Sequence, residues 1–257
     1  MLTILLALLV AEAHVHDAPE HNPPPMSKEA VPKLRGSAVD LAVEGHTSQA
    51  YLARPGGAAK GAVLLVHEWW GLTGWVKHMA DELADEGYLA LAVDLYKGKV
   101  TSDPKEASAL MQAKDEKWGD AVEEAGLEWL KAQGGGAKIA TVGWCMGGGE
   151  SLKASLNDPK DVSATVMFYG HPVEDVAKLK TLRGPLLGLW GNADKGIPPS
   201  TVAAFDKALT EAGVKHEFHA YDAGHGFANP SSGSYQSAAA KDAWAEATKF
   251  LAATLRK

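Results

Sequence analysis

Residues 138–149 carry the sequence KIATVGWCMGGG, and this stretch decides the fold. A short apolar run ends in the pattern Gly-x-Cys-x-Gly and is followed by a segment that can form a helix from residue 147 to residue 157. The pattern is typical of a sharp strand-to-helix turn that lifts a nucleophile above a sheet. Glycine is needed at positions 143 and 147 because side chains there would collide with neighbouring backbone. A helix N-terminus favours a thiolate, so the turn predicts a reactive Cys145; the alternative is a glycine-rich turn with an inert thiol.

Short apolar runs alternate with helical segments around this stretch. The runs lack polar alternation, so we expect strands buried on both faces at residues 62–66, 89–93, 138–142, 164–169, 185–190 and 217–221. Helices are expected at residues 76–86, 104–133, 147–157, 199–212 and 235–255. Alternating apolar residues at 39–52 predict an antiparallel hairpin that turns at residues 44–46. The chain therefore predicts an α/β domain at residues 37–257, with a mostly parallel, doubly wound sheet and an N-terminal hairpin.

Two later strand ends carry possible partners for Cys145. Asp194 follows the apolar run at 185–190, and His225 lies between two glycines after the run at 217–221. In such sheets ligands bind outside the carboxyl ends of the strands, where all three side chains would meet. The order nucleophile, acid, histidine also fits this kind of fold. Because a free cysteine has a pKa of about 8.5, we expect His225 as its base and Asp194 as the group that orients His225.

Other titratable residues follow strands as well. His67 and His171 each come at or just after a strand end, and the simpler interpretation of both is a residue that lines the site or a satisfied hydrogen bond. Asp222 is the rival of Asp194, but it lies too near His225 in the sequence to be the usual acid.

An acyl-transfer site also needs donors for the oxyanion of the tetrahedral intermediate. The backbone N–H of Met146 is one candidate, because this residue follows Cys145 and opens the predicted helix. The second is the N–H of Trp69, in the loop HEWWGL at residues 67–72. The simpler reading of that loop is an aromatic surface turn.

Five segments together resemble the dienelactone hydrolase family, the carboxymethylenebutenolidases, over about residues 37–255. They are His67-Glu68-Trp69-Trp70-Gly71, Asp94-Leu95-Tyr96, Gly143-Trp144-Cys145-Met146-Gly147-Gly148, Gly191-Asn192-Ala193-Asp194 and Ala223-Gly224-His225-Gly226-Phe227. The resemblance implies an α/β-hydrolase fold and hydrolysis of an ester or lactone through an acyl-cysteine. It also implies that Glu68 contacts the resting thiol and swings away when substrate binds, and that Tyr96 lines the substrate pocket.

One departure from the family bears on the substrate. Dienelactone hydrolases hold a free carboxylate with two arginines, and the position of the arginine after the catalytic histidine is occupied here by Asn229. The arginines of the chain are Arg35, Arg54, Arg183 and Arg256, outside all these segments. Loss of a bidentate clamp predicts a less charged ester, thioester or lactone, held by Trp69, Trp70, Trp144, Tyr96 and Phe227. A lysine, Lys105, Lys114 or Lys117, could restore a positive charge.

Composition narrows the possible partners. The 257 residues carry a formal net charge of −7 and no run of Lys or Arg, so nucleic acid is not expected as a partner. The single cysteine excludes an intramolecular disulfide. A small-molecule substrate is expected, and the chemistry needs no metal and no organic cofactor.

The N-terminus resembles an export signal. Residues 2–11 are almost wholly apolar and lead to Ala11-Glu12-Ala13, a small-x-small cleavage pattern, although no Lys or Arg precedes them. We expect cleavage near Ala13, a periplasmic or extracellular protein and no stable membrane insertion afterwards. A Pro- and His-rich linker is expected at residues 14–36, and its histidines, His14, His16 and His21, favour a solvated tail over a weak metal site.

Two other functions stay open at this point. The first is an exported binding or thiol-sensing protein that keeps the fold without turnover, which would show a reactive thiol but no acyl intermediate. The second is a metal-dependent role of the histidine-rich tail, which deletion of residues 14–25 would abolish.

Overall fold

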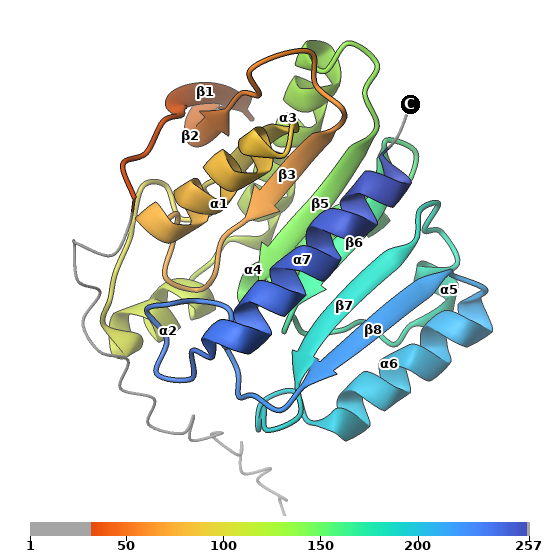
Figure 1. The fold of residues 1–257 in the computed structure, drawn as a ribbon. Coiled ribbons are helices and arrows are strands. Elements are labelled where there is room, and N and C mark those ends of the chain that lie inside the picture. The colour runs from red at the N-terminus through yellow and green to blue at the C-terminus, as the bar shows by residue number, and fades with distance from the viewer. Residues whose placement is uncertain (1–31, 256–257) are drawn as a thin grey trace, which may run out of the picture.

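The computed structural model describes residues 32–255, which form one eight-stranded sheet between layers of helices (Figure 1). The strands lie in the order β1-β2-β4-β3-β5-β6-β7-β8. β1 pairs antiparallel with β2 and β2 with β4, whereas every later pair is parallel. The strands are β1 (Ser37–Val43), β2 (His46–Ala53), β3 (Ala62–Val66), β4 (Leu89–Val93), β5 (Ile139–Trp144), β6 (Val162–Phe168), β7 (Leu186–Gly191) and β8 (His216–Tyr221). The predicted parallel sheet with its N-terminal hairpin is confirmed.

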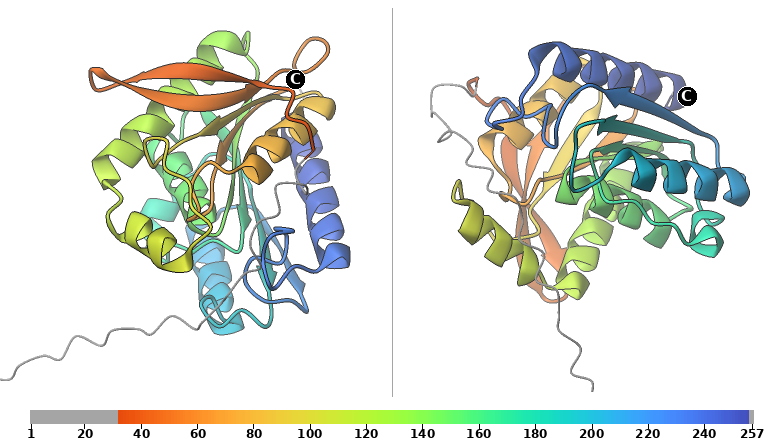
Figure 2. Two further views of the ribbon diagram at one scale, coloured as in Figure 1. Left: turned by 90° about the vertical axis from the view of Figure 1, so that its left-hand side faces the viewer. Right: turned by 90° about the horizontal axis from the view of Figure 1, so that it is seen from below.

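Helices cover both faces of the sheet. α1 and α7 pack on one face and α3 and α4 on the other, as the views in Figure 2 show. The helices are α1 (Gly74–Asp85), α2 (Pro104–Gln112), α3 (Glu116–Gln133), α4 (Met146–Asn157), α5 (Val176–Leu179), α6 (Pro199–Ala212) and α7 (Ser237–Thr254). No helix among the described residues is both long enough and apolar enough to cross a membrane.

The predicted helix at 104–133 is wrong as a single element, because the structure divides it into α2 and α3. The break follows from a second N-cap within the segment. The carboxylate of Asp115 accepts hydrogen bonds from the N–H groups of Lys117 and Trp118, and this starts a new helix. The short helix α5 was not predicted.

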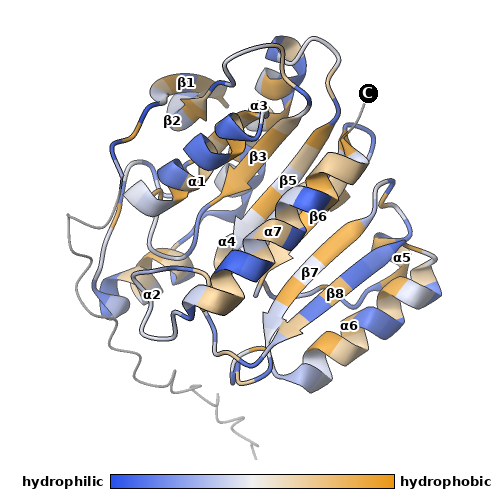
Figure 3. Cartoon of the chain, viewed as in Figure 1, coloured by the Kyte–Doolittle hydropathy of each residue, from blue (hydrophilic) through white to orange (hydrophobic). Residues whose placement is uncertain are grey.

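The strands in the middle of the sheet are more buried than the strands at its two edges. All residues of β3, β4, β5 and β7 are buried, as predicted for strands covered on both faces. Figure 3 shows the contrast between the apolar β7 and the mixed β8. The prediction of a strand buried on both faces is wrong for β8, because it is an edge strand whose residues are all partly or fully exposed.

The hairpin turn follows the sequence prediction. Glu44 and Gly45 join β1 to β2, and both have positive φ angles, 45° and 79°. Two consecutive residues of this kind make a type I′ turn, whose twist matches that of the strands it connects.

The predicted signal sequence and most of the predicted linker lie outside the described residues. The last linker residues are held to the domain: the backbone N–H groups of Arg35 and Gly36 donate to the carboxylate of Asp81 on α1. Asp81 also accepts from the hydroxyl of Tyr51 at 2.9 Å, so this carboxylate fixes the entry of the chain into the domain.

Candidate active site

Cys145 occupies a strained turn between β5 and α4. Its φ and ψ angles are 56° and −120°, in a region that residues other than glycine rarely adopt. A Cβ atom on Gly143 would lie 1.8 Å from the carbonyl oxygen of Gly147, and one on Gly147 would lie 2.2 Å from that of Val66. The predicted reason for both glycines is therefore confirmed. The turn leaves Cys145 partly exposed at the carboxyl edge of the sheet, where a substrate can reach it.

Asp194 and His225 meet at the same edge from the loops after β7 and β8. Nδ1 of His225 donates to Oδ2 of Asp194 at 2.7 Å. The other carboxylate oxygen of Asp194 accepts from the N–H groups of Gly196 at 2.8 Å and Ile197 at 3.0 Å, which fix its orientation. Because Nδ1 is engaged as a donor, Nε2 of His225 is the ring nitrogen available to accept a proton.

The charges in this group support one another. Burial lowers the pKa of His225, but interaction with Cys145 and the hydrogen bond to Asp194 outweigh burial and raise this pKa well above its usual value. Burial raises the pKa of Asp194, but the hydrogen bonds from His225, Ile197 and Gly196 outweigh it and hold this pKa below its usual value. The arrangement therefore favours proton binding by His225 beside an ionised Asp194.

Glu68 is a buried carboxylate held by uncharged groups. The side-chain amide of Asn229 donates to Oε2, and the hydroxyl of Tyr169 lies 3.5 Å from Oε1. Burial raises the pKa of Glu68 to about 7, although the hydrogen bonds from Asn229 and Tyr169 and the charge of His225 oppose the change. Within residues 32–255 no hydrogen bond joins Glu68 to Cys145, so this conformation lacks the contact that the family resemblance implied.

Tyr169 and Asn229 were missed as site residues. Tyr169 follows β6, has a φ angle of 39°, and places its ring edge-on to that of His225 at 5.1 Å. Its position directly after a buried strand was the available signal. Asn229 stands at the position of a family arginine, and no local pattern in the sequence indicates that its amide reaches Glu68.

The two predicted oxyanion donors lie at the start of a helix and in a loop after a strand, as the sequence predicts. Met146 is the first residue of α4, and Trp69 lies in the loop after β3. Within the described part of the chain neither N–H donates a hydrogen bond. Gly71 bends that loop with a φ angle of 87° and donates its N–H to the carbonyl of Glu68 at 3.2 Å.

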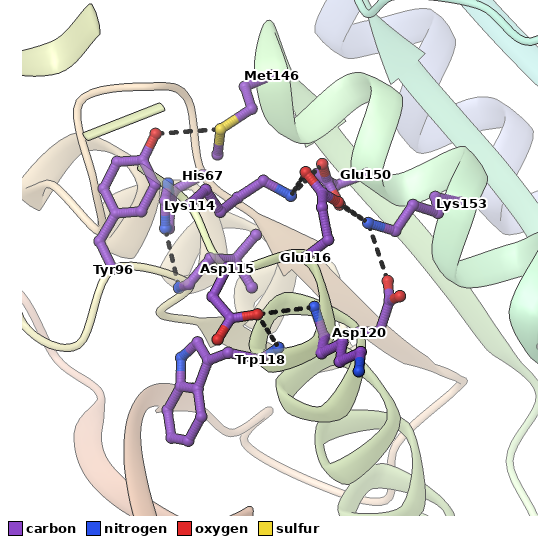
Figure 4. Close-up of polar contacts among 12 residues, drawn as sticks. His67, Tyr96, Lys114, Asp115, Glu116, Trp118, Asp120, Met146, Glu150 and Lys153 are labelled. Carbon is purple, nitrogen blue, oxygen red and sulfur yellow. Dashed lines mark hydrogen bonds and ion pairs between the residues drawn. The ribbon is translucent and has the colours of Figure 1, made fainter. Parts of the chain in front are cut away.

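The predicted substrate contacts Trp69, Trp70 and Tyr96 differ in exposure, because Tyr96 is buried with 5% of its surface exposed. Trp69 and Trp70 are both partly exposed and pack edge-to-face at 4.8 Å. The hydroxyl of Tyr96 donates to the sulfur of Met146 at 3.1 Å, which places it beside the turn that carries Cys145 (Figure 4).

The predicted roles of Trp144 and Phe227 in substrate binding are wrong. Both side chains are almost completely enclosed by protein. Trp144 is the last residue of β5 and packs in the core against Phe168 at 5.2 Å and Trp75 at 5.3 Å. Phe227 packs against Tyr169 at 5.3 Å. A residue next to a catalytic position in sequence can thus belong to the core, because successive side chains along a strand point to opposite faces.

The rival histidines and the rival acid are not part of this group. His67 is buried, donates from Nδ1 to the carbonyl of Glu68 at 2.6 Å and accepts at Nε2 from the N–H of Leu95 at 3.1 Å. These bonds require a neutral ring, and burial lowers the pKa of His67 accordingly. It is the satisfied hydrogen-bonding residue of the simpler interpretation. His171 and Asp222 are exposed.

The three lysines that could replace the positive charge of an arginine are either paired with carboxylates or exposed to solvent. Lys114 is almost wholly enclosed and forms ion pairs with Glu150 at 2.8 Å and Glu116 at 3.0 Å (Figure 4). Lys105 and Lys117 are exposed. The charge of Lys114 is therefore already balanced by carboxylates.

The sheet, the strained turn and the Asp194–His225 pair define an α/β hydrolase. The profile of the dienelactone hydrolase family matches residues 48–255, and the chain belongs to this family. A protein of Saccharolobus solfataricus assigned as a carboxymethylenebutenolidase is 30% identical over 81% of this chain and 95% of its own length. One of Salmonella typhimurium with the same assignment is 32% identical over 81% of this chain and 84% of its own.

Solved structures agree with this assignment. A Klebsiella pneumoniae structure assigned as a dienelactone hydrolase is 28% identical, with a TM-score of 0.77 over 85% of this chain and 98% of that one. The dienelactone hydrolase-like phosphotriesterase P91 is 22% identical with a TM-score of 0.78, over 87% of this chain and 99% of its own, which shows the shared fold alone. The protein is therefore a hydrolase of small esters or lactones.

Proposed function

We propose that the hydrolysis runs through a Cys145–His225–Asp194 triad and an acyl-cysteine intermediate. The observation that carries the proposal is His225, which is bonded to buried Asp194 and lies close enough to Cys145 for the sulfur to raise its pKa. A thiolate is the reactive form of cysteine, and an adjacent imidazolium stabilises it.

In the proposed first half-reaction, Nε2 of His225 takes the thiol proton and the sulfur of Cys145 attacks the carbonyl carbon. The carbonyl π electrons move to oxygen, and the N–H groups of Met146 and Trp69 stabilise the oxyanion. When the intermediate collapses, the bond to the leaving oxygen, or to sulfur in a thioester, breaks. His225 then protonates the leaving group, and the acyl group stays on the sulfur.

In the second half-reaction, His225 removes a proton from water as the water oxygen attacks the acyl carbon. Collapse of this intermediate breaks the carbon–sulfur bond, releases the acid and returns the proton to Cys145. Asp194 stays ionised throughout and holds the ring of His225 in the required tautomer.

Glu68 is proposed to control the charge beside the nucleophile. An ionised Glu68 near the sulfur would oppose the thiolate, whereas the neutral form would not. A pKa of about 7 lets Glu68 change between these forms near neutral pH. Its contact with Asn229 is the conformation away from the thiol, and a rotation towards Cys145 would protect the chain's only thiol between turnovers.

The proposed substrate lacks a free carboxylate. The amide of Asn229, at the position of a family arginine, donates to Glu68, and Lys114 is already paired with two carboxylates. Trp69 and Trp70 are partly exposed and offer aromatic surface instead. A marked preference for substrates with a free carboxylate over their neutral esters would contradict this part of the proposal.

Export is also proposed, from the apolar residues 2–11 and the cleavage pattern at Ala13. Mass spectrometry of the protein recovered from the periplasm or medium tests it. A mature chain that begins near His14 supports export, and an intact Met1 in a purely cytoplasmic protein contradicts it.

Intact-protein mass spectrometry after brief mixing with activated esters tests the mechanism. Because the chain has one cysteine, a thiol adduct can form only on Cys145. An adduct that decays with turnover is expected in the wild type and in H171Q, which removes an exposed histidine at a comparable strand end. In H225Q the adduct is expected to form at least 100-fold more slowly, in line with the loss of a general base. Turnover without any adduct would contradict the acyl-cysteine and favour direct attack by water.

A further inference from the structure

A cluster of charged side chains lies between α3 and α4, and no step of the proposed hydrolysis uses it (Figure 4). It contains four carboxylates and two ammonium groups, so its net charge is −2 when all six are ionised. The members of this cluster are Lys114, Glu116, Asp120, Glu123, Glu150 and Lys153.

The two lysines neutralise one side of the cluster. Nζ of Lys114 lies 2.8 Å from Oε1 of Glu150 and 3.0 Å from Glu116. Nζ of Lys153 lies 2.9 Å from Asp120 and 3.0 Å from Oε2 of Glu150. These ion pairs bring α4 to α3, but they leave Glu123 without a cation at hydrogen-bonding distance.

Glu123 is the unexplained member. Its side chain is 1% exposed, and neither carboxylate oxygen has a hydrogen-bond partner. An ionised carboxylate in such a place is strongly unfavourable unless a cation or a proton neutralises it. Burial and then the charge of Glu150 raise its pKa, in keeping with a missing positive charge.

The geometry points to a cation between three of the carboxylates. One oxygen each from Asp120, Glu123 and Glu150 lies within 4.8 Å of the others. Oxygen ligands at about 2.3–2.6 Å from a common calcium ion are separated by no more than about 5 Å, so the three carboxylates meet the spacing limit for a shared ion and need only a small inward movement if all are at the upper bound. The side chain of Asp120 is 42% exposed and gives the ion and its remaining water ligands a route from solvent.

We propose that Asp120, Glu123 and Glu150 bind one divalent cation that prefers oxygen ligands, of the kind represented by Ca²⁺, Mn²⁺ and Mg²⁺. A charge of +2 would balance the −2 of the cluster. The ion would join the middle of α3 to the first turns of α4, the helix that begins next to Cys145. Its role is to stabilise this helix pair, and it takes no part in the bond-breaking steps.

A second group of possible cation ligands differs from the buried site in its exposure to solvent. It consists of Glu217, His219 and Glu246. It lies on β8 and α7, and each of its members is at least partly exposed. His219 already contacts Glu217 at 2.7 Å, so no unpartnered buried group calls for an ion there. The test therefore includes H219A to remove this alternative.

Isothermal titration calorimetry and thermal unfolding test the proposal on the whole protein, first treated with a chelator and dialysed. CaCl₂, MnCl₂ and MgCl₂ are titrated separately. We expect one cation per chain and a higher Tm for the wild type with at least one of them, as for any ligand that binds only the folded state. E124Q removes the same charge from the adjacent exposed position of α3 and should leave both results unchanged, as should H219A.

E123Q is the decisive variant. The amide keeps the size of the side chain but removes the charge, so we expect at least a tenfold weaker affinity and no rise in Tm at the concentration that saturates the wild type. If E123Q does not fold, D120N gives the same comparison at a more exposed position. A wild type that binds none of the three cations, or an E123Q variant that binds as tightly as the wild type, would overturn the proposal. Glu123 would then be a buried carboxylic acid neutralised by a proton.

Discussion

Two groups of three residues meet at the carboxyl edge of the sheet, and they control charge in different ways. In the first, Cys145, His225 and Asp194, charges of opposite sign lie side by side, so interaction outweighs burial and the pKa of His225 is raised. In the second, the carboxylate of Glu68 is hydrogen-bonded by the neutral groups of Asn229 and Tyr169, and burial outweighs these bonds and the charge of His225, so its pKa rises to about 7. Adjacent charges of opposite sign therefore favour ions in one group, and burial among neutral partners favours a neutral acid in the other.

The largest effect is expected at the nucleophile. C145A should lower kcat for a neutral ester on the order of 10⁵-fold, because alanine has no nucleophilic atom to carry the acyl group. Steady-state hydrolysis with a chromogenic ester measures this loss, and circular dichroism checks that the variant is folded. A variant that keeps more than one-tenth of the wild-type rate would contradict the role of Cys145.

The second-largest loss of activity is expected when the carboxylate that pairs with His225 is removed. D194N should lower kcat by about 10⁴-fold, because an asparagine no longer holds the ring of His225 with Nε2 free and no longer stabilises its charged form. The same kinetic assay measures it, with D222N as a matched control at an exposed aspartate three residues before His225. Equal losses in both variants would mean that the contact between Asp194 and His225 is not what matters.

The buried Glu68 predicts that the protein loses stability as pH rises, which is the opposite of the effect of a carboxylate held in an ion pair. The pKa of Glu68 is raised from 4.5 to about 7, so the folded protein holds this proton more tightly than the unfolded chain. This contribution to stability is present below pH 4.5 and is lost as pH rises through about 7. The free energy of unfolding of E68Q should therefore rise relative to that of the wild type by up to roughly 3 kcal/mol between pH 4.5 and pH 8, at about 1.4 kcal/mol per pKa unit. Urea unfolding at both pH values measures the difference, and a constant difference would refute it.

The smallest expected effect is a shift in the pKa of Glu68, which distinguishes the two hydrogen bonds to its carboxylate. N229A should raise the pKa of Glu68 further and move the corresponding step in the pH profile of kcat/KM upward by about one unit, the equivalent of one hydrogen bond. Y169F should move it less, because the hydroxyl lies 3.5 Å from the carboxylate. A larger shift in Y169F than in N229A would reverse the assignment of the stronger partner.

Much of the first group could be predicted from the sequence. Its three residues follow predicted strands, of which β5 and β7 are buried and β8 is an edge strand, and the carboxyl ends of parallel strands lie at one edge. The glycines around Cys145 further reveal the turn, because the backbone there tolerates no Cβ. The partners of Glu68 could not be predicted in this way. Asn229 lies 161 residues from Glu68 and within an irregular loop, whose path no local pattern indicates.

The sequence by itself determined the order of the strands and of most helices, the sharp turn at Cys145 and the acid and histidine that follow it, since each depends on local backbone preferences and on hydrophobic spacing. Only the tertiary structure decided that Trp144 packs in the core, that Lys114 pairs with Glu150 and that Glu123 lies buried without a hydrogen-bond partner. These outcomes depend on which side chains from distant elements meet, and on the cost of enclosing their charges, which spacing along one chain does not record.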